Sequence, residues 1–368
     1  MSEPEPLARA RTEQEVLDAI ERRRRRPRVK LMDEHVTLAH GAGGKSSHAL
    51  VEALFLPELR NPLLETLSDS AVFAPNGGTA RLAFTTDSFV VKPLFFPGGD
   101  IGELAVNGTI NDLAMAGARP LCLSAGFIVE EGFGTGELRR IAASMGSAAK
   151  SVGVPIAAGD TKVVERGKAD GLYVTTAGIG AVEPGVRLGP ESIRPGDRVV
   201  VSGTLGDHGM AIMIARGELE LEVELESDTA ALNELVALLL GAVPGVRCLR
   251  DPTRGGVATV LNELALGAEV GIVLDESTIP VRPEVNGACE ILGIDPLYVA
   301  NEGKLVAIVA PADAERALEA LRSHPLGREA RLVGEVRAEP PGMVLLDTAF
   351  GGSRVVDMLA GDPLPRIC

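Results

Sequence analysis

A turn-rich segment near the middle of the chain is the feature that most limits how this sequence can fold. Residues 187–197 read RLGPESIRPGD, in which Gly, Pro and Asp, three residue types that favour turns, cluster. Mixed helix and strand patterns precede this segment, and a second round of them follows it. The 368 residues suffice for two domains with a substantial core. We therefore expect a mixed α/β (α+β) protein of two domains that join here.

The periodicity of apolar residues predicts the individual elements. RLAFTTDSFVV alternates and is rich in β-branched and aromatic residues, which is typical of a strand. The small-residue segment from Ile101 predicts a helix that Gly117 and Pro120 end. The other expected strands are 154–160, 172–182, 198–203, 271–275 and 304–310. The other expected helices are 136–153, 210–217, 255–268, 283–293 and 313–323.

Composition narrows the class of protein. Aromatic residues make up 3% of the chain and Trp is absent, so the core consists of Val, Leu, Ile and Ala, and stacking platforms for single-stranded nucleic acid are not expected. The net charge of −15 argues against nucleic-acid and anionic-membrane partners. No apolar run is long enough to span a bilayer. The four cysteines form no CxxC pair, so we expect reduced thiols and a cytoplasmic protein.

The two ends differ from the rest of the chain. Residues 1–35 include the run Arg22–Arg26, for which the interpretations are a disordered extension, which we favour, and a docking arm for an acidic partner. Residues 357–368 contain Gly and Pro breaks and end on Cys368. We expect this segment to be a flexible tail that carries the terminal thiol.

A glycine-rich loop precedes the first helical pattern. HGAGGK, His40–Lys45, leads into SSHALVEAL, and glycines there would let backbone N–H groups approach an anion at a helix N-terminus. The spacing matches neither the P-loop nor GxGxxG. A nucleotide-binding loop and a plain turn both remain open.

Five aspartates lie at loop tips or on small-residue elements, flanked by Gly, Ser or Thr. Carboxylates that converge from several loops can bind Mg²⁺, which prefers hard oxygen ligands. Each Asp alone is more often a cap or turn residue, whereas five beside a glycine-rich loop indicate a metal and polyphosphate site. The candidates are Asp69, Asp87, Asp112, Asp160 and Asp251.

Several other polar residues accompany the aspartates. Asn107 and Asn111 share a helix face, so they bind either a ligand or a helix partner. Arg254 in DPTRGG could clamp a phosphate between glycine-rich turns. Lys162 in GDTK and Glu302 in ANEGK could neutralise charge or move a proton.

These motifs occur in the same order in a known family. The chain resembles the hydrogenase maturation factors of the HypE family, carbamoyl dehydratases of the PurM-like (AIR synthetase-related) ATP-binding superfamily. The resemblance covers about residues 36–368 and is carried by HGAGGK, TTDSFVV, NGTINDLAMAGARP, AGDTKVV, GDHG, DPTRGGVAT, ANEGK and the terminal PRIC. The PRIC ending separates this family from its superfamily relatives.

The resemblance implies a fold and an assembly. It implies a PurM-like ATP-binding domain at 36–186, a C-terminal PurM-like α/β domain at 187–356 and the tail at 357–368. The N-terminal domain would contribute strands to a β-barrel in a homodimer.

The resemblance also implies a reaction. HypF would deliver a carbamoyl group to the thiol of Cys368, and ATP-dependent dehydration would convert this thiocarbamate to a thiocyanate. The cyano group would then pass to iron on a HypC–HypD complex, as the cyanide ligand of [NiFe]-hydrogenase. The alternatives are another ATP-dependent synthetase or kinase of the superfamily, and a nucleotide-switched carrier without catalysis.

Roles follow from the matching motifs. The resemblance implies ATP and Mg²⁺ as cofactors, with the five aspartates as metal-ligand candidates. Cys368, Lys162 and Glu302 would be catalytic. The residues expected to bind the nucleotide are His40, Gly41, Gly43, Gly44, Lys45, Asn107, Asn111, Thr161, Arg254 and Gly255.

Overall fold

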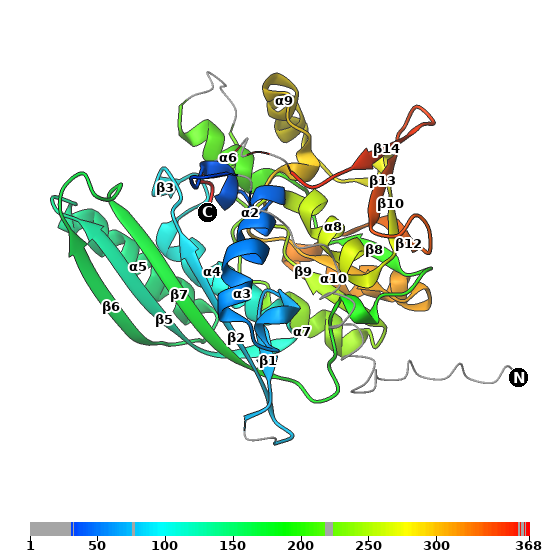
Figure 1. Cartoon of the computed structure of the whole chain (residues 1–368), viewed down its shortest axis with the longest axis horizontal. Coiled ribbons are helices and arrows are strands. Elements are labelled where there is room, and N and C mark those ends of the chain that lie inside the picture. Colours follow the sequence, from blue (N-terminus) through cyan, green and yellow to red (C-terminus); the bar gives the residue numbers. More distant parts are fainter. Residues whose placement is uncertain are drawn as a thin grey trace, which may run out of the picture.

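The computed structural model describes residues 31, 33–75, 78–217, 224–359, 361, 364 and 366–368 (Figure 1). The expectations for residues 1–30, including the arginine run, lie outside the described residues. None of the helices in the described part of the chain is long and apolar enough to cross a membrane.

The first domain is built on a five-stranded sheet, drawn at the left of Figure 1. β5 and β6 pair in parallel, whereas the other neighbours are antiparallel. The order across the sheet is β1 (Ala71–Phe73), β2 (Arg81–Phe89), β7 (Leu172–Val182), β5 (Ala118–Glu130) and β6 (Ile156–Val164).

Two helices cover one face of this sheet. α4 (Ile101–Met115) packs on β2, β5 and β7, and α5 (Thr135–Ser151) packs beside it. Side chains alternate along β7, so every second residue from Leu172 is buried. A Cβ at Gly178 would come within 2.8 Å of Thr109, so glycine lets α4 approach closely. The opposite face stays partly exposed, and β6 is exposed along most of its length.

Short elements surround this layer. α2 (Lys45–Leu50) and α3 (Leu56–Leu59) follow the glycine-rich loop and are joined by a turn of π-helix, Val51–Phe55. β3 (Phe95–Phe96) and β4 (Gly99–Asp100) form a small hairpin before α4.

The second domain has a seven-stranded sheet with helices on both faces. The strand order is β14 (Ser353–Val356), β13 (Met343–Asp347), β10 (Gly271–Asp275), β12 (Arg331–Arg337), β8 (Arg198–Val201), β11 (Val306–Val309) and β9 (Val246–Arg250). The helices are α6 (Asp207–Ala215), α7 (Asn233–Ala242), α8 (Gly256–Ala268), α9 (Pro283–Leu292) and α10 (Ala314–Arg322).

Three apolar clusters form the core. One joins α4 and α5 to α6 and to Leu364 and Ile367 of the C-terminal segment. The second lies between α8 and its side of the seven-stranded sheet, and the third lies under α7 and α10. The expectation of a mixed α and β fold is therefore confirmed. The boundaries differ in places, since α4 ends at Met115 and β5 begins at Ala118.

Candidate active site

Three carboxylates converge from the start of β1, from α4 and from the end of β9. Asp69 precedes β1, Asp112 lies on α4 and Asp251 follows β9 directly, and one oxygen of each lies within 4.8 Å of the others. The Thr85 hydroxyl of β2 lies within hydrogen-bond distance of both Asp112 Oδ2, at 2.6 Å, and the Asp69 carbonyl, at 2.8 Å. One threonine thus ties the first two carboxyl-bearing segments together.

Burial and mutual repulsion shift the proton affinities of this acidic cluster. Burial raises the pKa of Asp251 to about 7, and the nearby charge of Asp69 adds to the effect. Burial, and then the charges of Asp251 and Asp69, hold the pKa of Asp112 well above its usual range. The charge of Asp87, near the end of β2, repels that of Asp112, and burial raises the pKa of Asp87 although Arg254 lowers it. Carboxylates held this close suit a hard divalent cation, so the donor set fits Mg²⁺.

Glu302 lies beside this cluster with a carboxyl group that is nearly inaccessible to solvent. Its side chain is 3% exposed, and Oε1 is buried without a hydrogen-bond partner. Burial, and then the charge of Asp251, holds the pKa of Glu302 well above its usual range. Its backbone is fixed, because the amide donates to Asp228 at 3.0 Å and the carbonyl accepts from Asn111 at 3.1 Å. A buried, unpartnered carboxyl group on a fixed backbone is suited to proton transfer.

The glycine-rich loop folds against the loop that carries Arg254. Arg254 Nη1 donates to the Gly41 carbonyl at 2.8 Å. A Cβ at Gly43, where φ is +77°, would come within 2.8 Å of the Arg254 carbonyl oxygen, so this approach requires glycine. Gly255 is also left-handed, with φ +78°, and turns the chain into α8.

The other residues of the glycine-rich loop contact neighbouring segments. His40 is buried, and its Nδ1 lies 3.0 Å from the backbone nitrogen of Thr37. Gly44 packs so closely against Leu359 that a Cβ would collide with its carbonyl. The Lys45 amide donates to the same carbonyl at 2.8 Å, and Lys45 Nζ pairs with Asp357. The loop is therefore held by the segment that leads to the chain end.

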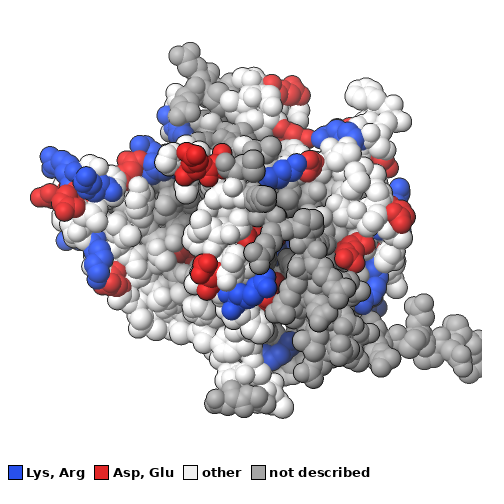
Figure 2. All heavy atoms as spheres, viewed as in Figure 1, with Lys and Arg blue, Asp and Glu red and all other residues white. Residues whose placement is uncertain are grey.

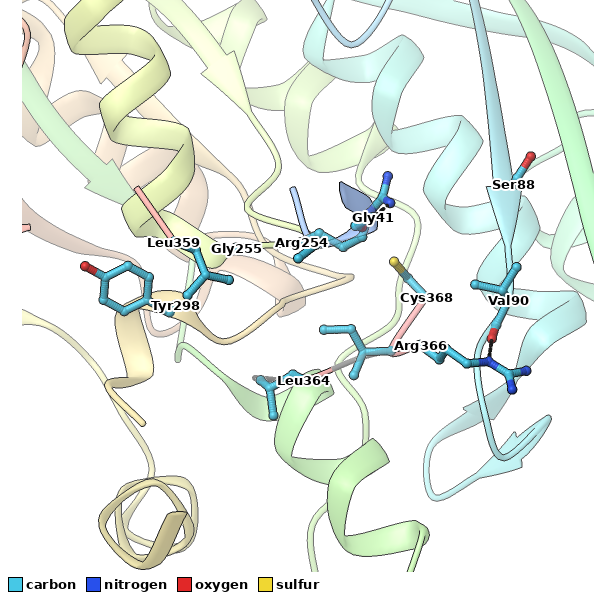
Figure 3. Close-up of a pocket in the computed structure, with 12 residues that line it drawn as sticks. Gly41, Ser88, Val90, Arg254, Gly255, Tyr298, Leu359, Leu364, Arg366 and Cys368 are labelled. Carbon is cyan, nitrogen blue, oxygen red and sulfur yellow. Dashed lines mark hydrogen bonds between the residues drawn. The ribbon is translucent and has the colours of Figure 1, made fainter. Parts of the chain in front are cut away.

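The terminal thiol lies in a small pocket between these loops. Figure 3 shows the sulfur of Cys368 turned toward Gly41 and Arg254, while the Arg366 side chain points the other way, toward Val90. The cavity, about 60 Å³, is also lined by Ser88, Gly255 and Tyr298. Ser88 is the neighbour of Asp87, and the charge of Arg254 acts on both Asp87 and Glu302. The pocket that holds the thiol thus shares Arg254 with Asp87 and Glu302.

The two asparagines of α4 contact protein groups. Asn111 donates to the carbonyls of Ala230 and Glu302 and accepts from the amide of Leu232 at 2.8 Å. Asn107 donates to Thr229 Oγ1 at 3.2 Å. These contacts match the helix-partner alternative, in which α4 holds the segment that carries Glu302.

Asp160, Thr161 and Lys162 do not join the cluster within one chain. They lie on the exposed strand β6, where Lys162 Nζ donates to Asp160 Oδ2 at 2.6 Å. The register runs from Asp160 through Gly126 and Thr175 to Ser88, which is three strand spacings, or about 14 Å. Lys162 and Glu302 are therefore separated in a single chain.

A half-buried ionic network supports the cluster and was not predicted from the sequence. Arg250 lies between Asp69, at 3.0 Å, and Glu263, at 2.5 Å, and His48 of α2 bonds Glu263 at 2.8 Å. The network links the helix after the glycine-rich loop to a cluster carboxylate. The only sequence signal was the position of Arg250 next to Asp251.

The surface does not repeat the clustering of acidic residues seen in the candidate site. Figure 2 shows acidic and basic side chains mixed over the described part of the visible face, without a large area of one sign.

Comparison with known proteins matches both halves of the chain. The family model of the AIR synthase related protein N-terminal domain matches residues 67–182, and the model of the corresponding C-terminal domain matches residues 194–346. The carbamoyl dehydratase HypE of Cupriavidus necator is 55% identical over 340 residues, which cover 92% of this chain and 97% of that protein. The carbamoyl dehydratase HypE of Escherichia coli K12 is 48% identical over 337 residues, or 91% and 99% of the two chains.

Solved structures show the same likeness. A chain of a HypE–HypF complex superposes with a TM-score of 0.80 at 48% identity and covers 84% of this chain and all of that one. A structure of the hydrogenase maturation protein HypE in complex with ATP gives a TM-score of 0.76 at 46% identity, over 91% and 100% of the two chains.

Proposed function

The chain belongs to the carbamoyl dehydratase HypE family, and from this membership we propose that it dehydrates a carbamoyl group carried on its own Cys368, at the expense of ATP. The observation that carries the proposal is the position of the terminal thiol. Cys368 lies in a pocket lined by the glycine-rich loop and by Arg254, whose charge also acts on Asp87 and Glu302.

In the proposed reaction the carbamoyl group accepts one phosphoryl group and loses both protons of its amide nitrogen. The carbonyl oxygen of the thiocarbamate attacks the γ-phosphate of ATP while the amide nitrogen loses a proton, which gives ADP and an S-bound imidoyl phosphate. The C–O bond then breaks as the nitrogen loses its second proton, and inorganic phosphate leaves. A thiocyanate remains on Cys368. Phosphorylation converts a poor leaving group into a good one.

Asp69, Asp112 and Asp251 would hold Mg²⁺ in this reaction, with Asp87 beside them. A bound Mg²⁺ supplies positive charge that offsets the phosphate oxygens. The backbone amides of His40–Lys45 and the Arg254 guanidinium would hold the nucleotide. Arg254 suits this role because a guanidinium matches phosphate oxygens in two-point contacts.

Glu302 is the proposed base within the same chain, since burial raises the pKa of its carboxyl group and so strengthens its carboxylate as a proton acceptor. Lys162 would come from a second copy, because it is remote from Glu302 in one chain. The sheet face opposite α4 and its edge strand expose Phe84, Leu121, Ile128 and Val163, a surface that a homodimer would bury. We propose that Lys162 of the partner subunit completes the site.

The proposal also includes partners. HypF would donate the carbamoyl group, consistent with the solved HypE–HypF complex of a relative, and a HypC–HypD complex would accept the cyano group. The setting would be the cytoplasm, where thiols remain reduced. Burial raises the pKa of Cys248 to about 12 and of Cys289 to about 11, so neither thiol suits this exchange.

Intact mass spectrometry tests the proposal. After incubation with HypF, carbamoyl phosphate and Mg·ATP, the chain should gain one carbamoyl group at Cys368 and then lose one water. Cys122→Ala is the matched control and should behave as wild type, whereas Cys368→Ala should gain nothing. ATP-dependent turnover of a small molecule by Cys368→Ala would instead support a synthetase or kinase, and a stable adduct with bound ATP would support a carrier.

A further inference from the structure

The last three residues of the chain are held along the backbone that follows β2. The Val90 amide donates to the Cys368 carboxyl-terminal oxygen at 3.0 Å, and the Lys92 amide donates to the Arg366 carbonyl at 3.1 Å. The C-terminal segment thus adds to the edge of residues 90–92 like a short strand. Ile367 and Leu364 are buried in the core cluster that joins α4 and α5 to α6.

The Arg366 side chain is fixed from the first domain. Its Nε donates to the Val90 carbonyl at 3.0 Å, and its Nη1 donates to Asp170 Oδ2. Lys92 Nζ donates to the same oxygen at 2.9 Å. These hydrogen bonds, that from Arg366 above all, hold the pKa of Asp170 below its ordinary value, so it is ionised at neutral pH.

Asp170 itself is presented by a fixed loop. Glu130 at the end of β5 accepts hydrogen bonds from the amides of Gly167 and Gly171, the latter at 2.9 Å. Both lie in the connection between β6 and β7. The loop that carries Asp170 is therefore held by contacts within the first domain that do not involve the C-terminal segment.

Two side chains of the second domain hold the tail backbone. His208 of α6 is fully buried, and its Nε2 donates to the Ile367 carbonyl at 2.6 Å. Arg216, just after α6, donates from Nη2 to the Arg366 carbonyl at 2.6 Å and from Nε to the Lys92 carbonyl at 2.8 Å. Arg216 and His208 thus bind the carbonyls of Arg366 and Ile367, while the Cys368 oxygen accepts from the Val90 amide.

We infer that Asp170, Arg216 and His208 form a receptor for the terminal Arg-Ile-Cys peptide and act as positioning residues that place the Cys368 thiol in the pocket. This inference rests on the proposed function for its catalytic consequence. The docked tail must also leave to exchange groups with partner proteins. The strength of these contacts therefore sets the fraction of molecules in which the thiol is docked for dehydration and the fraction in which it is exposed.

The test measures both positions in the full-length protein. Asp170→Asn and, independently, Arg216→Gln should speed alkylation of Cys368 by iodoacetamide about tenfold, the effect of one charge-assisted hydrogen bond. Each should slow dehydration of the carbamoylated Cys368 by a similar factor and leave the KM for ATP unchanged. Glu165→Gln removes the same charge from the same loop and should match wild type.

Two buried cysteines provide an internal control for folding. Cys248 and Cys289 should stay slow to react in every variant, because a general loosening would expose them too. Unchanged alkylation of Cys368 in both variants, or faster alkylation with undiminished dehydration, would overturn the inference. Absence of dehydration in the wild type would instead refute the proposed function, while the alkylation result still decides whether the receptor exists.

Discussion

At the residue scale, burial is what turns ordinary carboxylates into candidates for chemistry. Glu302 is inaccessible and unpartnered at Oε1, whereas the exposed Asp160 is paired with Lys162. The sequence showed both as acidic residues in glycine-containing motifs. Glu302 differs from Asp160 because Asn111 of α4 and Asp228 hold its backbone in the interior. The convergence of Asp69, Asp112 and Asp251 was predictable as a possibility, because each lies at a loop tip or on a small-residue helix.

The raised pKa of Asp251 predicts that this residue lowers the free energy of unfolding of the metal-free protein as the pH rises. The folded state keeps the proton up to about pH 7, whereas an unfolded chain releases it near pH 4. Between these values the folded state binds more protons, so its stability falls as the pH rises. Asp251→Asn removes this loss of stability. The variant should therefore melt at a progressively higher temperature than wild type from about pH 4 to pH 7 without divalent cations.

Calorimetry over this pH range, with and without Mg²⁺, checks the prediction. Mg²⁺ should raise the melting temperature of the wild type and leave Asp251→Asn nearly unchanged. Melting curves that stay parallel across the pH range, or an equal response to Mg²⁺, would contradict the assignment of Asp251 to a metal site.

At the element scale, the sequence predicted the strongly patterned elements and missed those shaped by tertiary contacts. The strand β2 and the helices α5 and α8 have clear periodicity, and all three form where expected. β5 was not predicted, because Ala118–Glu130 carries Pro120 near its start and small residues along its length. Its neighbours β6 and β7 stabilise it as a strand. The same sheet edge places Lys162 away from Glu302, which sequence order alone could not show.

Mixed dimers test whether Lys162 acts across the dimer. Co-expression of Lys162→Ala chains with Cys368→Ala chains should restore about a quarter of wild-type dehydration, since half of the dimers are mixed and each has one complete site. Neither variant alone should dehydrate at more than about a hundredth of the wild-type rate.

Glu302 provides the matched control. A mixture of Glu302→Gln and Cys368→Ala chains should stay inactive, because Glu302 and Cys368 belong to the same chain's site. Recovery in the Glu302 mixture, or none in the Lys162 mixture, would contradict the arrangement.

At the scale of the whole molecule, the chain end links the two domains. The last residues contact residues 90–92 and Asp170 of the first domain and α6 of the second, and their thiol enters a pocket lined by both. The sequence indicated a flexible tail with a reactive end. It could not indicate where the tail docks, because Asp170, Arg216 and His208 are 150 or more residues from the cysteine.

The proposed reaction depends on the carbamoyl oxygen leaving as phosphate, and an isotope label follows this oxygen. Cys368 is carbamoylated with ¹⁸O in the carbonyl position, the adduct is isolated, and Mg·ATP is added. We expect one ¹⁸O in the inorganic phosphate released, at the same rate as the protein loses the mass of one water. Unlabelled phosphate, with the ¹⁸O released into water or retained on the protein, would contradict the proposed reaction.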